Sequence, residues 1–138
     1  MAKAYHHKLH ADEQEVFAAM DQLVGVAASW SVGAEQQDFL RLALEELLLN
    51  VCHHSGLGTD AEVDVALFRF DALLRLQIQD PGPSFDPFAR ATPDLDVPLE
   101  DREIGGLGIH FVRSTSTRCE WRREGDRNVV EVDWALPA

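Results

Sequence analysis

Basic residues are scarce in this chain, which has 12 lysines and arginines against 24 aspartates and glutamates in 138 residues. Proteins that bind nucleic acids usually present a basic face to the phosphate backbone. A formal net charge of -12 therefore argues against direct nucleic-acid binding. It fits a basic protein partner better, although an acidic surface also serves solubility alone.

Long apolar runs are also missing. No run approaches the roughly 18 residues that a membrane-spanning helix needs, and residues 1–7 lack the apolar segment of a signal peptide. The sequence has only two cysteines, Cys52 and Cys119. As small apolar groups they suit a reducing compartment better than a disulfide. We therefore expect a cytoplasmic protein without a membrane partner.

The remaining composition is that of a globular domain. Hydrophobic residues make up 46% of the sequence and charged residues 26%, which is enough for a sizeable core. The sequence contains no internal repeat and no sign of a second domain. We predict a single domain over residues 1–138.

Apolar residues three or four apart predict helices, and strict alternation predicts strands. Asp12 is a candidate N-cap, and Glu15 would complete a capping box. Glycines and prolines between residues 86 and 105 predict a long loop. The expected order is a strand over 3–9, helices over 11–29 and 34–54, a hairpin of 62–67 with 74–79, a helix over 107–117, and a closing hairpin of 119–123 with 128–136.

The helix over residues 34–54 is rich in leucine, yet it carries a polar stripe. At about 100° per residue, the polar side chains fall within an arc of about 100° beside the apolar face. The stripe consists of Glu46, Asn50, His53 and His54, and the apolar face of Leu40, Leu44, Leu47, Leu48 and Val51. Burying unpaired polar groups costs roughly 2–7 kcal/mol, so the stripe indicates a polar cleft that holds a ligand. An ordinary solvated helix face is the alternative, and this helix alone does not decide between them.

Asp80 follows the alternating residues Leu74, Leu76 and Ile78, so a carboxylate takes the inward position at the end of that strand. The prolines on either side of Gly82 end the strand, and Gly82 lets a flat ligand approach the backbone. An inward carboxylate here can accept a hydrogen bond from an exocyclic amine such as that of adenine. A turn-capping aspartate is the alternative.

A glycine-rich turn, Gly105-Gly106-Leu107-Gly108, lies at the start of the helix expected over 107–117. Backbone N–H groups in such a turn form a cradle for a phosphate or another anion. Neither the lysine of a Walker A loop nor the GxGxxG spacing is present. Without that lysine, a magnesium ion held by oxygen ligands is the obvious means of neutralising phosphate charge.

Together and in this order, the three features resemble the GHKL (Bergerat-fold) ATP-binding superfamily. More narrowly, the chain looks like the bacterial anti-sigma-factor serine/threonine kinases of partner-switching systems. Glu46 with Asn50 matches the N box, residues 80–87 match the DxGxxFDP box, and residues 106–108 match the second glycine box. Residues 122–130 look like the final hairpin, so the resemblance covers nearly the whole chain. No dimerisation helix with a phospho-accepting histidine precedes the domain, which favours the anti-sigma branch.

The resemblance implies an α+β fold, a two-layer α/β sandwich whose mixed, mainly antiparallel sheet is covered on one face by about three helices. It also implies ATP and Mg²⁺ as cofactors. In that family, the residue at Asn50 ligates the metal, the one at Asp80 accepts from the adenine amine, and the one at Glu46 is the general base. The remaining implied nucleotide-site residues are His54 near the phosphates, Gly82, Phe85, Gly106, Leu107 and Gly108, with residues 88–104 as a lid.

The function that the resemblance implies is an ATP-dependent protein serine/threonine kinase that acts as an anti-sigma factor. Its partners would be a sigma factor or analogous target and a STAS-type antagonist, which it phosphorylates. A homodimer is a further possible assembly, since many relatives dimerise. The alternative function is a catalytically silent ATP-binding module that sequesters a partner.

Three positions depart from the family pattern. Pro81 replaces a polar residue, Ser84 stands where glycine is frequent, and the hydroxyl-rich residues 114–117 stand where relatives tend to place an acidic residue. We assign that hydroxyl-rich segment no function from the sequence. A metal site at His6, His7 and His10 is a weaker alternative, because these residues lack companion cysteines.

Overall fold

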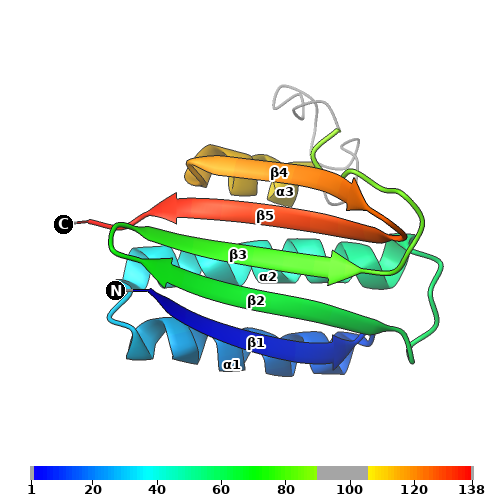
Figure 1. Ribbon diagram of the computed structural model, residues 1–138, viewed down its shortest axis with the longest axis horizontal. Coiled ribbons are helices and arrows are strands. Elements are labelled where there is room, and N and C mark those ends of the chain that lie inside the picture. Colours follow the sequence, from blue (N-terminus) through cyan, green and yellow to red (C-terminus); the bar gives the residue numbers. More distant parts are fainter. Residues whose placement is uncertain (1, 90–105, 138) are drawn as a thin grey trace.

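The computed structural model describes residues 2–89 and 106–137 (Figure 1). Every predicted helix and strand is present, with ends that shift by a few residues. The elements are β1 (Lys3–His10), α1 (Glu13–Ser29), α2 (Ala34–His54), β2 (Glu62–Phe70), β3 (Leu73–Asp80), α3 (Gly106–Thr115), β4 (Arg118–Glu124) and β5 (Arg127–Ala135). Residues 90–105, which make up most of the predicted loop and lid, lie outside the described residues.

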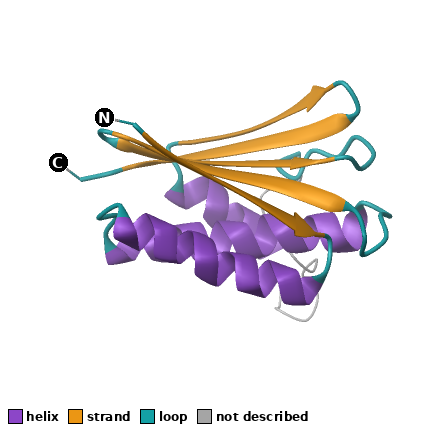
Figure 2. Ribbon diagram, turned by 60° about the horizontal axis from the view of Figure 1, so that its bottom comes forward, coloured by secondary structure: helices purple, strands orange, loops and turns teal. Residues whose placement is uncertain are grey.

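The five strands form one sheet in the order β1-β2-β3-β5-β4, and each pairing is antiparallel. The three helices cover one face of this sheet (Figure 2). These layers confirm the predicted α+β sandwich with a mainly antiparallel sheet. The pairing of β3 with β5 places Asp80 opposite Asn128, which matters for the site.

The core lies between the helices and the inner face of the sheet. Alternation along β3 puts Leu74, Leu76 and Ile78 into this core, each at most 2% exposed. Leu40 and Leu44 of α2 pack against them and have no exposed surface. Each such side chain contributes about 1.5–3 kcal/mol by leaving water. The apolar face of α2 is therefore held against the sheet, and its polar stripe is directed to the edge of that contact.

The capping prediction for α1 is correct for one residue and wrong for the other. Asp12 Oδ1 accepts from the backbone N–H of Gln14 at 3.1 Å, as an N-cap should. Glu15 does not complete the capping box, because the N–H of Asp12 already donates to the carbonyl of His10 at 2.8 Å. Glu15 instead accepts from the backbone N–H of His10 at 2.9 Å.

The hydroxyl-rich segment ends α3 and joins it to the sheet. Ser114 and Thr115 both donate to the carbonyl of Phe111, at 3.2 Å and 2.8 Å. Ser116 donates to the carbonyl of Arg113 at 3.3 Å, while Thr117 Oγ1 crosses to the carbonyl of Asp133 on β5 at 3.1 Å. Backbone carbonyls at a helix end need such partners. This segment therefore has a structural role.

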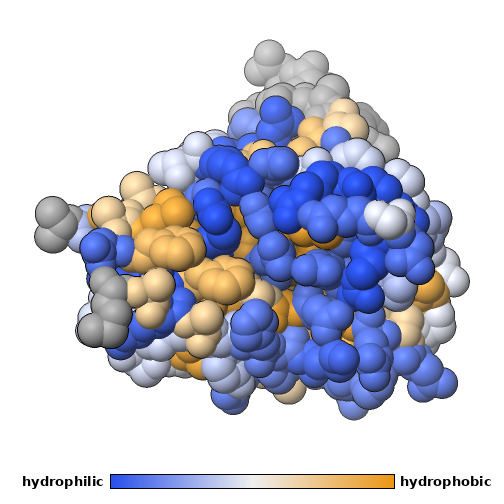
Figure 3. Space-filling view, viewed as in Figure 1, coloured by the Kyte–Doolittle hydropathy of each residue, from blue (hydrophilic) through white to orange (hydrophobic). Residues whose placement is uncertain are grey.

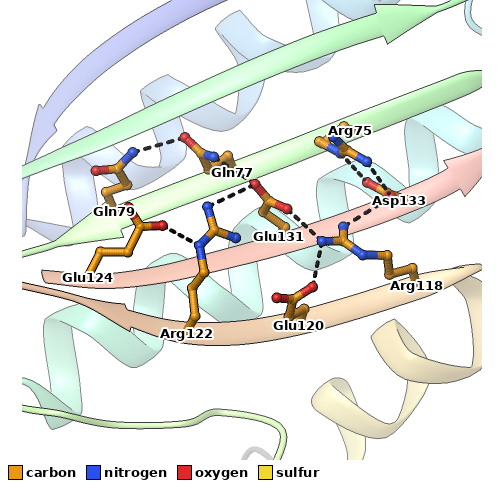
Figure 4. A network of polar contacts seen from close by, with 9 residues as sticks. All are labelled: Arg75, Gln77, Gln79, Arg118, Glu120, Arg122, Glu124, Glu131 and Asp133. Atoms are coloured by element: carbon orange, nitrogen blue, oxygen red, sulfur yellow. Dashed lines mark hydrogen bonds and ion pairs between the residues drawn. The ribbon is translucent and has the colours of Figure 1, made fainter.

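The outer face of the sheet, away from the helices, is largely polar, with an apolar area toward the end where both termini lie (Figure 3). A network of arginines, carboxylates and glutamines crosses β3, β5 and β4 on this face (Figure 4). Both cysteines are free. Within residues 2–89 and 106–137, no helix has the length and apolarity needed to cross a bilayer.

Candidate functional site

A cavity lies between the C-terminal half of α2, the end of β3 and the start of β5. Asn50 reaches it from α2, Asp80 from β3 and Asn128 from β5. The chain after β3 supplies Phe85 with its neighbouring prolines, and the remaining wall is apolar apart from Ser55. The full lining is Leu47, Asn50, Val51, Ser55, Ile78, Asp80, Pro83, Phe85, Pro87, Asn128 and Val130. The fold therefore brings together three of the predicted site residues, Asn50, Asp80 and Phe85.

Asp80 faces inward, as its position in the alternation predicts, and is 6% exposed. Its Oδ1 accepts from the N–H of Gly82 at 2.9 Å and from Asn128 Nδ2 at 3.2 Å. One oxygen thus caps the turn, which was the alternative role. Among the described residues Oδ2 has no hydrogen-bond donor, so this oxygen is available as an acceptor. Binding of an amine to it stays a prediction.

Gly82 is required by the packing of the protein itself. A Cβ at this position would lie 2.8 Å from Asp80 Oδ1 and 3.1 Å from the Cβ of Ser55. A side chain here would displace either the capping carboxylate or the end of α2. Close approach of a ligand, the reason that the sequence suggests, stays a prediction. Pro81 and Ser84, the two departures from the family pattern, are exposed and take no part in the described cavity wall.

The polar stripe of α2 divides among three surroundings. Asn50 is half-buried in the cavity wall, and its amide has no hydrogen-bond partner within the described parts of the chain. His53 instead contacts Glu13 of α1, with Nε2 and Oε1 2.6 Å apart. His54 stacks on the ring of Phe85, with centroids 5.8 Å apart and planes 15° from parallel. The solvated-face alternative thus fits His53, whereas Asn50 belongs to the cavity.

Glu46 lies one helical turn before Asn50 and packs against α3. A Cβ at Gly108 would overlap the carboxyl group of Glu46, so a larger residue here would force the Glu46 side chain to move. Burial raises the pKa of Glu46, and the negative charge of Glu45 raises it further. Gly106 and Leu107 are the first residues of α3. The predicted phosphate cradle therefore lies at the N-terminus of the helix that packs against Glu46. Gly105 lies outside the described residues.

Asn128, which is 3% exposed and lines the cavity, was not predicted as a site residue from the sequence. Its side chain bonds to Asp80, to the chain after β3 and to Trp121. The alternation that places Val130 inward also places Asn128 inward, which is the signal that could have identified it. That Asn128 lies opposite Asp80 could not be predicted without knowing the order of the strands in the sheet.

The cavity wall offers an oxygen ligand of the kind that a divalent cation takes. Mg²⁺ usually takes one or two protein oxygens and completes its shell with phosphates and water. The amide of Asn50 in the cavity wall, unpaired among the described residues, would supply one such oxygen. Over residues 2–89 and 106–137, no group of three or more histidine, cysteine, aspartate or glutamate side chains is placed to hold a metal by itself. His10 contacts Glu15, and His7 stacks on Tyr5.

Comparison with known proteins agrees with this architecture. The family model of the histidine kinase-like ATPase domain matches residues 9–134. No curated protein matches the sequence significantly. The crystal structure of the RsbU and RsbW domains of Rv1364c from Mycobacterium tuberculosis superposes on 99% of this chain with a TM-score of 0.69 and 14% identity.

This chain spans 33% of that solved chain. The histidine kinase AdeS of Acinetobacter baumannii also superposes on 99% of this chain, with a TM-score of 0.53 and 14% identity, over 70% of its own length. At such low identity these two likenesses establish the fold alone.

Proposed function

Since the chain belongs to the histidine kinase-like ATPase domain family, we propose that it is an ATP-dependent protein serine/threonine kinase acting as an anti-sigma factor. The observation that carries this proposal is the arrangement of Glu46 and Asn50 on α2. Asn50 presents a free amide to the cavity, and Glu46 lies one turn away as a carboxylate whose pKa is raised by burial. A base with a raised pKa removes a proton more effectively once it is ionised.

In the proposed reaction, the adenine and the phosphates of ATP bind at opposite ends of the site. At one end, Asp80 Oδ2 accepts from the adenine amine. At the other, the N–H groups at the start of α3 face the phosphates. Glu46 takes the proton from a serine or threonine hydroxyl, whose oxygen bonds to the γ-phosphorus while the bond to the ADP oxygen breaks. Magnesium bound with ATP neutralises charge on the phosphate oxygens, and the Asn50 oxygen would hold it.

The proposed partners follow from partner switching. One is a sigma factor or an analogous target, and the other is a STAS-type antagonist that leaves once it is phosphorylated. The net charge of -12 suits basic surfaces on such proteins. The similarity to a structure whose described domains include an RsbW domain supports this choice. A cytoplasmic location and a homodimer remain parts of the proposal.

The test is a transfer assay with the purified chain, ATP, Mg²⁺ and a candidate antagonist protein. We expect phosphoserine or phosphothreonine on the antagonist. Glu46→Ala should stop transfer and leave ATP binding within about threefold of the unmodified chain, because Glu46 lies outside the cavity wall. Glu35→Ala is the matched control, since it removes a carboxylate from the first turn of the same helix. Absence of transfer to the correct antagonist would overturn the proposal.

The same variants distinguish the kinase from a silent binding module. A module of that kind would hold its partner only with ATP bound, and Asn50→Ala would release the partner. Glu46→Ala would then have no effect on partner binding. That pattern would replace the kinase with the sequestering function.

A further inference from the structure

Asn128 is the most connected polar side chain beside the cavity. It lies on β5 directly opposite Asp80, on the inner face of the sheet. Its Nδ2 donates to the carbonyl of Pro83 at 2.8 Å and to Asp80 Oδ1 at 3.2 Å, with the carbonyl of Gly82 at 3.4 Å. Its Oδ1 accepts from the N–H of Phe85 at 3.1 Å and from Trp121 Nε1 at 3.0 Å.

These contacts use the whole hydrogen-bonding capacity of the amide. An asparagine side chain has two N–H donors and two acceptor lone pairs. Both lone pairs of Oδ1 face N–H donors, and the two N–H groups face a carbonyl and a carboxylate. A nucleotide in the cavity could therefore contact Asn128 only if one of these bonds broke. The side chain is built to hold other groups in place.

The groups that it holds are those that define one end of the cavity. The bonds from Gly82 and Asn128 both go to Asp80 Oδ1, so they restrain the plane of a carboxylate that lines the cavity and leave Oδ2 without a donor among the described residues. The bond to the Phe85 N–H places the ring that stacks on His54. From β4, Arg123 Nη1 donates to the carbonyl of Gly82 at 2.7 Å and braces the same turn. Two strands thus support the turn between Asp80 and Phe85.

We propose that Asn128 is the positioning residue of the adenine site, and that it selects for the exocyclic amine by orienting Asp80 without touching the nucleotide. This rests on the proposed nucleotide binding, but it requires no phosphoryl transfer. Without the amide, Asp80 Oδ1 loses one of its two donors, and Phe85 loses the acceptor for its N–H. The carboxylate then rotates, and its preference for an amine is lost.

The test compares two nucleotides that differ only in that amine, ATP and purine riboside triphosphate, by calorimetric titration with Mg²⁺. In the unmodified chain we expect ATP to bind at least about tenfold more tightly, since hydrogen bonds to a charged group are among the stronger ones. In Asn128→Ala the preference should fall to less than about twofold, while the affinity for purine riboside triphosphate changes by less than about threefold. The calorimetric preference is a readout that mere destabilisation would not move.

Three further variants complete the design. Asp80→Ala should abolish the preference, and adding Asn128→Ala to it should cause no further loss, because both changes act through one carboxylate. Gln79→Ala is the matched control. It removes an amide from the residue next to Asp80, but on the outer face of β3, where Gln79 Nε2 donates to Gln77 at 2.9 Å. The amine preference should survive this change.

A preference retained in Asn128→Ala would overturn the inference and leave Asn128 as a purely structural residue. If Asn128→Ala does not fold, Trp121→Phe replaces it. That change removes only the indole N–H that donates to Asn128 Oδ1, and the preference should fall by about two- to fivefold. An unchanged preference would then reject the inference. Failure of the unmodified chain to bind either nucleotide would overturn both this inference and the proposed function, whereas binding without transfer would affect the kinase alone.

Discussion

Glu46 and Asp80 are carboxylates at the same site whose surroundings prepare them for different tasks. Asp80 is held by two hydrogen bonds to one oxygen, which gives it a defined orientation. Glu46 has no hydrogen-bond donor among the described residues, and burial against α3 raises its pKa. An oriented acceptor suits recognition of an amine, and a desolvated carboxylate suits proton removal.

The pKa of Glu46 should change when the charge of its neighbour Glu45 is removed. Burial raises the pKa of Glu46 and the negative charge of Glu45 raises it further, so Glu45→Gln should lower that pKa but leave it above that of an ordinary glutamate, because the burial remains. The acidic limb of the transfer rate should move to lower pH with it. The measurement is a carbon-13 NMR titration of the Glu46 carboxyl group.

The raised pKa of Glu46 also determines how its contribution to folding stability depends on pH. Because the folded pKa of Glu46 is raised, this group favours the folded state at low pH, and that contribution is lost as pH rises through the folded pKa. Glu35→Gln, on the first turn of α2, is the control and should leave the Glu46 titration unchanged. An identical titration in Glu45→Gln would contradict this prediction.

At the scale of elements, the contact of α2 with α3 depends on a missing side chain. Gly108 lies within α3, where glycine costs about 0.5–1 kcal/mol relative to alanine. The helix carries glycine here because the Glu46 carboxyl group occupies the space that a Cβ would need. The second glycine box is thus partly a packing requirement between two helices.

Two helical glycines should respond to alanine with opposite signs. Gly25 lies in α1, and no atom comes within 4 Å of the position that a Cβ would take there, so Gly25→Ala should stabilise the protein by about 0.5–1 kcal/mol. Gly108→Ala should destabilise it by about 1–3 kcal/mol through overpacking. Urea unfolding measures both.

The cause can be isolated with a double variant. In a Glu46→Ala background the overlapping carboxyl group is gone, so Gly108→Ala should become neutral or stabilising. Destabilisation of the same size in that background would show that some other contact excludes the methyl group.

At the scale of the whole molecule, the outer face of the sheet carries arginines and carboxylates that form ion pairs with one another within a small area. Asp133 accepts from Arg75 at 2.8 Å and from Arg118 at 3.1 Å, and Glu131 accepts from Arg118 at 2.7 Å. Burial opposes ionisation of Glu131, but hydrogen bonds from Arg118, Gln77 and Arg122 outweigh it, so its pKa falls to about 2. This network ties β3, β4 and β5 together on the side without helices (Figure 4).

Acid should therefore weaken the fold through Glu131. Its folded pKa is about 2, below the roughly 4.3 of an unfolded glutamate, so its contribution is present above that value and is lost as pH falls toward 2. At pH 7, Glu131→Gln should cost about 1–3 kcal/mol of unfolding free energy. The difference from the unmodified chain should shrink below pH ~4.3, as measured by urea unfolding across pH.

The control for this prediction is Glu120→Gln on the same face. Glu120 also contacts Arg118, at 2.6 Å, but its side chain is 45% exposed. Such a surface pair contributes about 0–1 kcal/mol. A cost for Glu131→Gln that is the same at pH 7 and pH 3 would show that the charge of Glu131 is not the source of its stabilisation.

The local spacing of apolar residues was sufficient to predict the helices and strands and the direction of several side chains. The leucine spacing predicted α2 over residues 34–54, and the alternation along β3 predicted that Asp80 points inward. The order of the motifs also indicated the family that the comparison confirmed. The helix and strand predictions depend on residues a few positions apart, so the physical rule behind them acts within one element, whereas the family was inferred by resemblance from motifs spread along the chain.

Contacts between distant elements were decided only by the tertiary structure. The strand order places β5 beside β3, and only this pairing brings Asn128 to Asp80. The approach of α3 to α2 makes Gly108 a neighbour of Glu46. Contacts of α2 with other parts of the chain divide the polar stripe, since His53 contacts Glu13 of α1 and His54 stacks on Phe85. The sequence by itself determined which groups the chain carries and which way each element turns them. Register and helix packing, which depend on long-range contacts that no local period encodes, decided which groups meet.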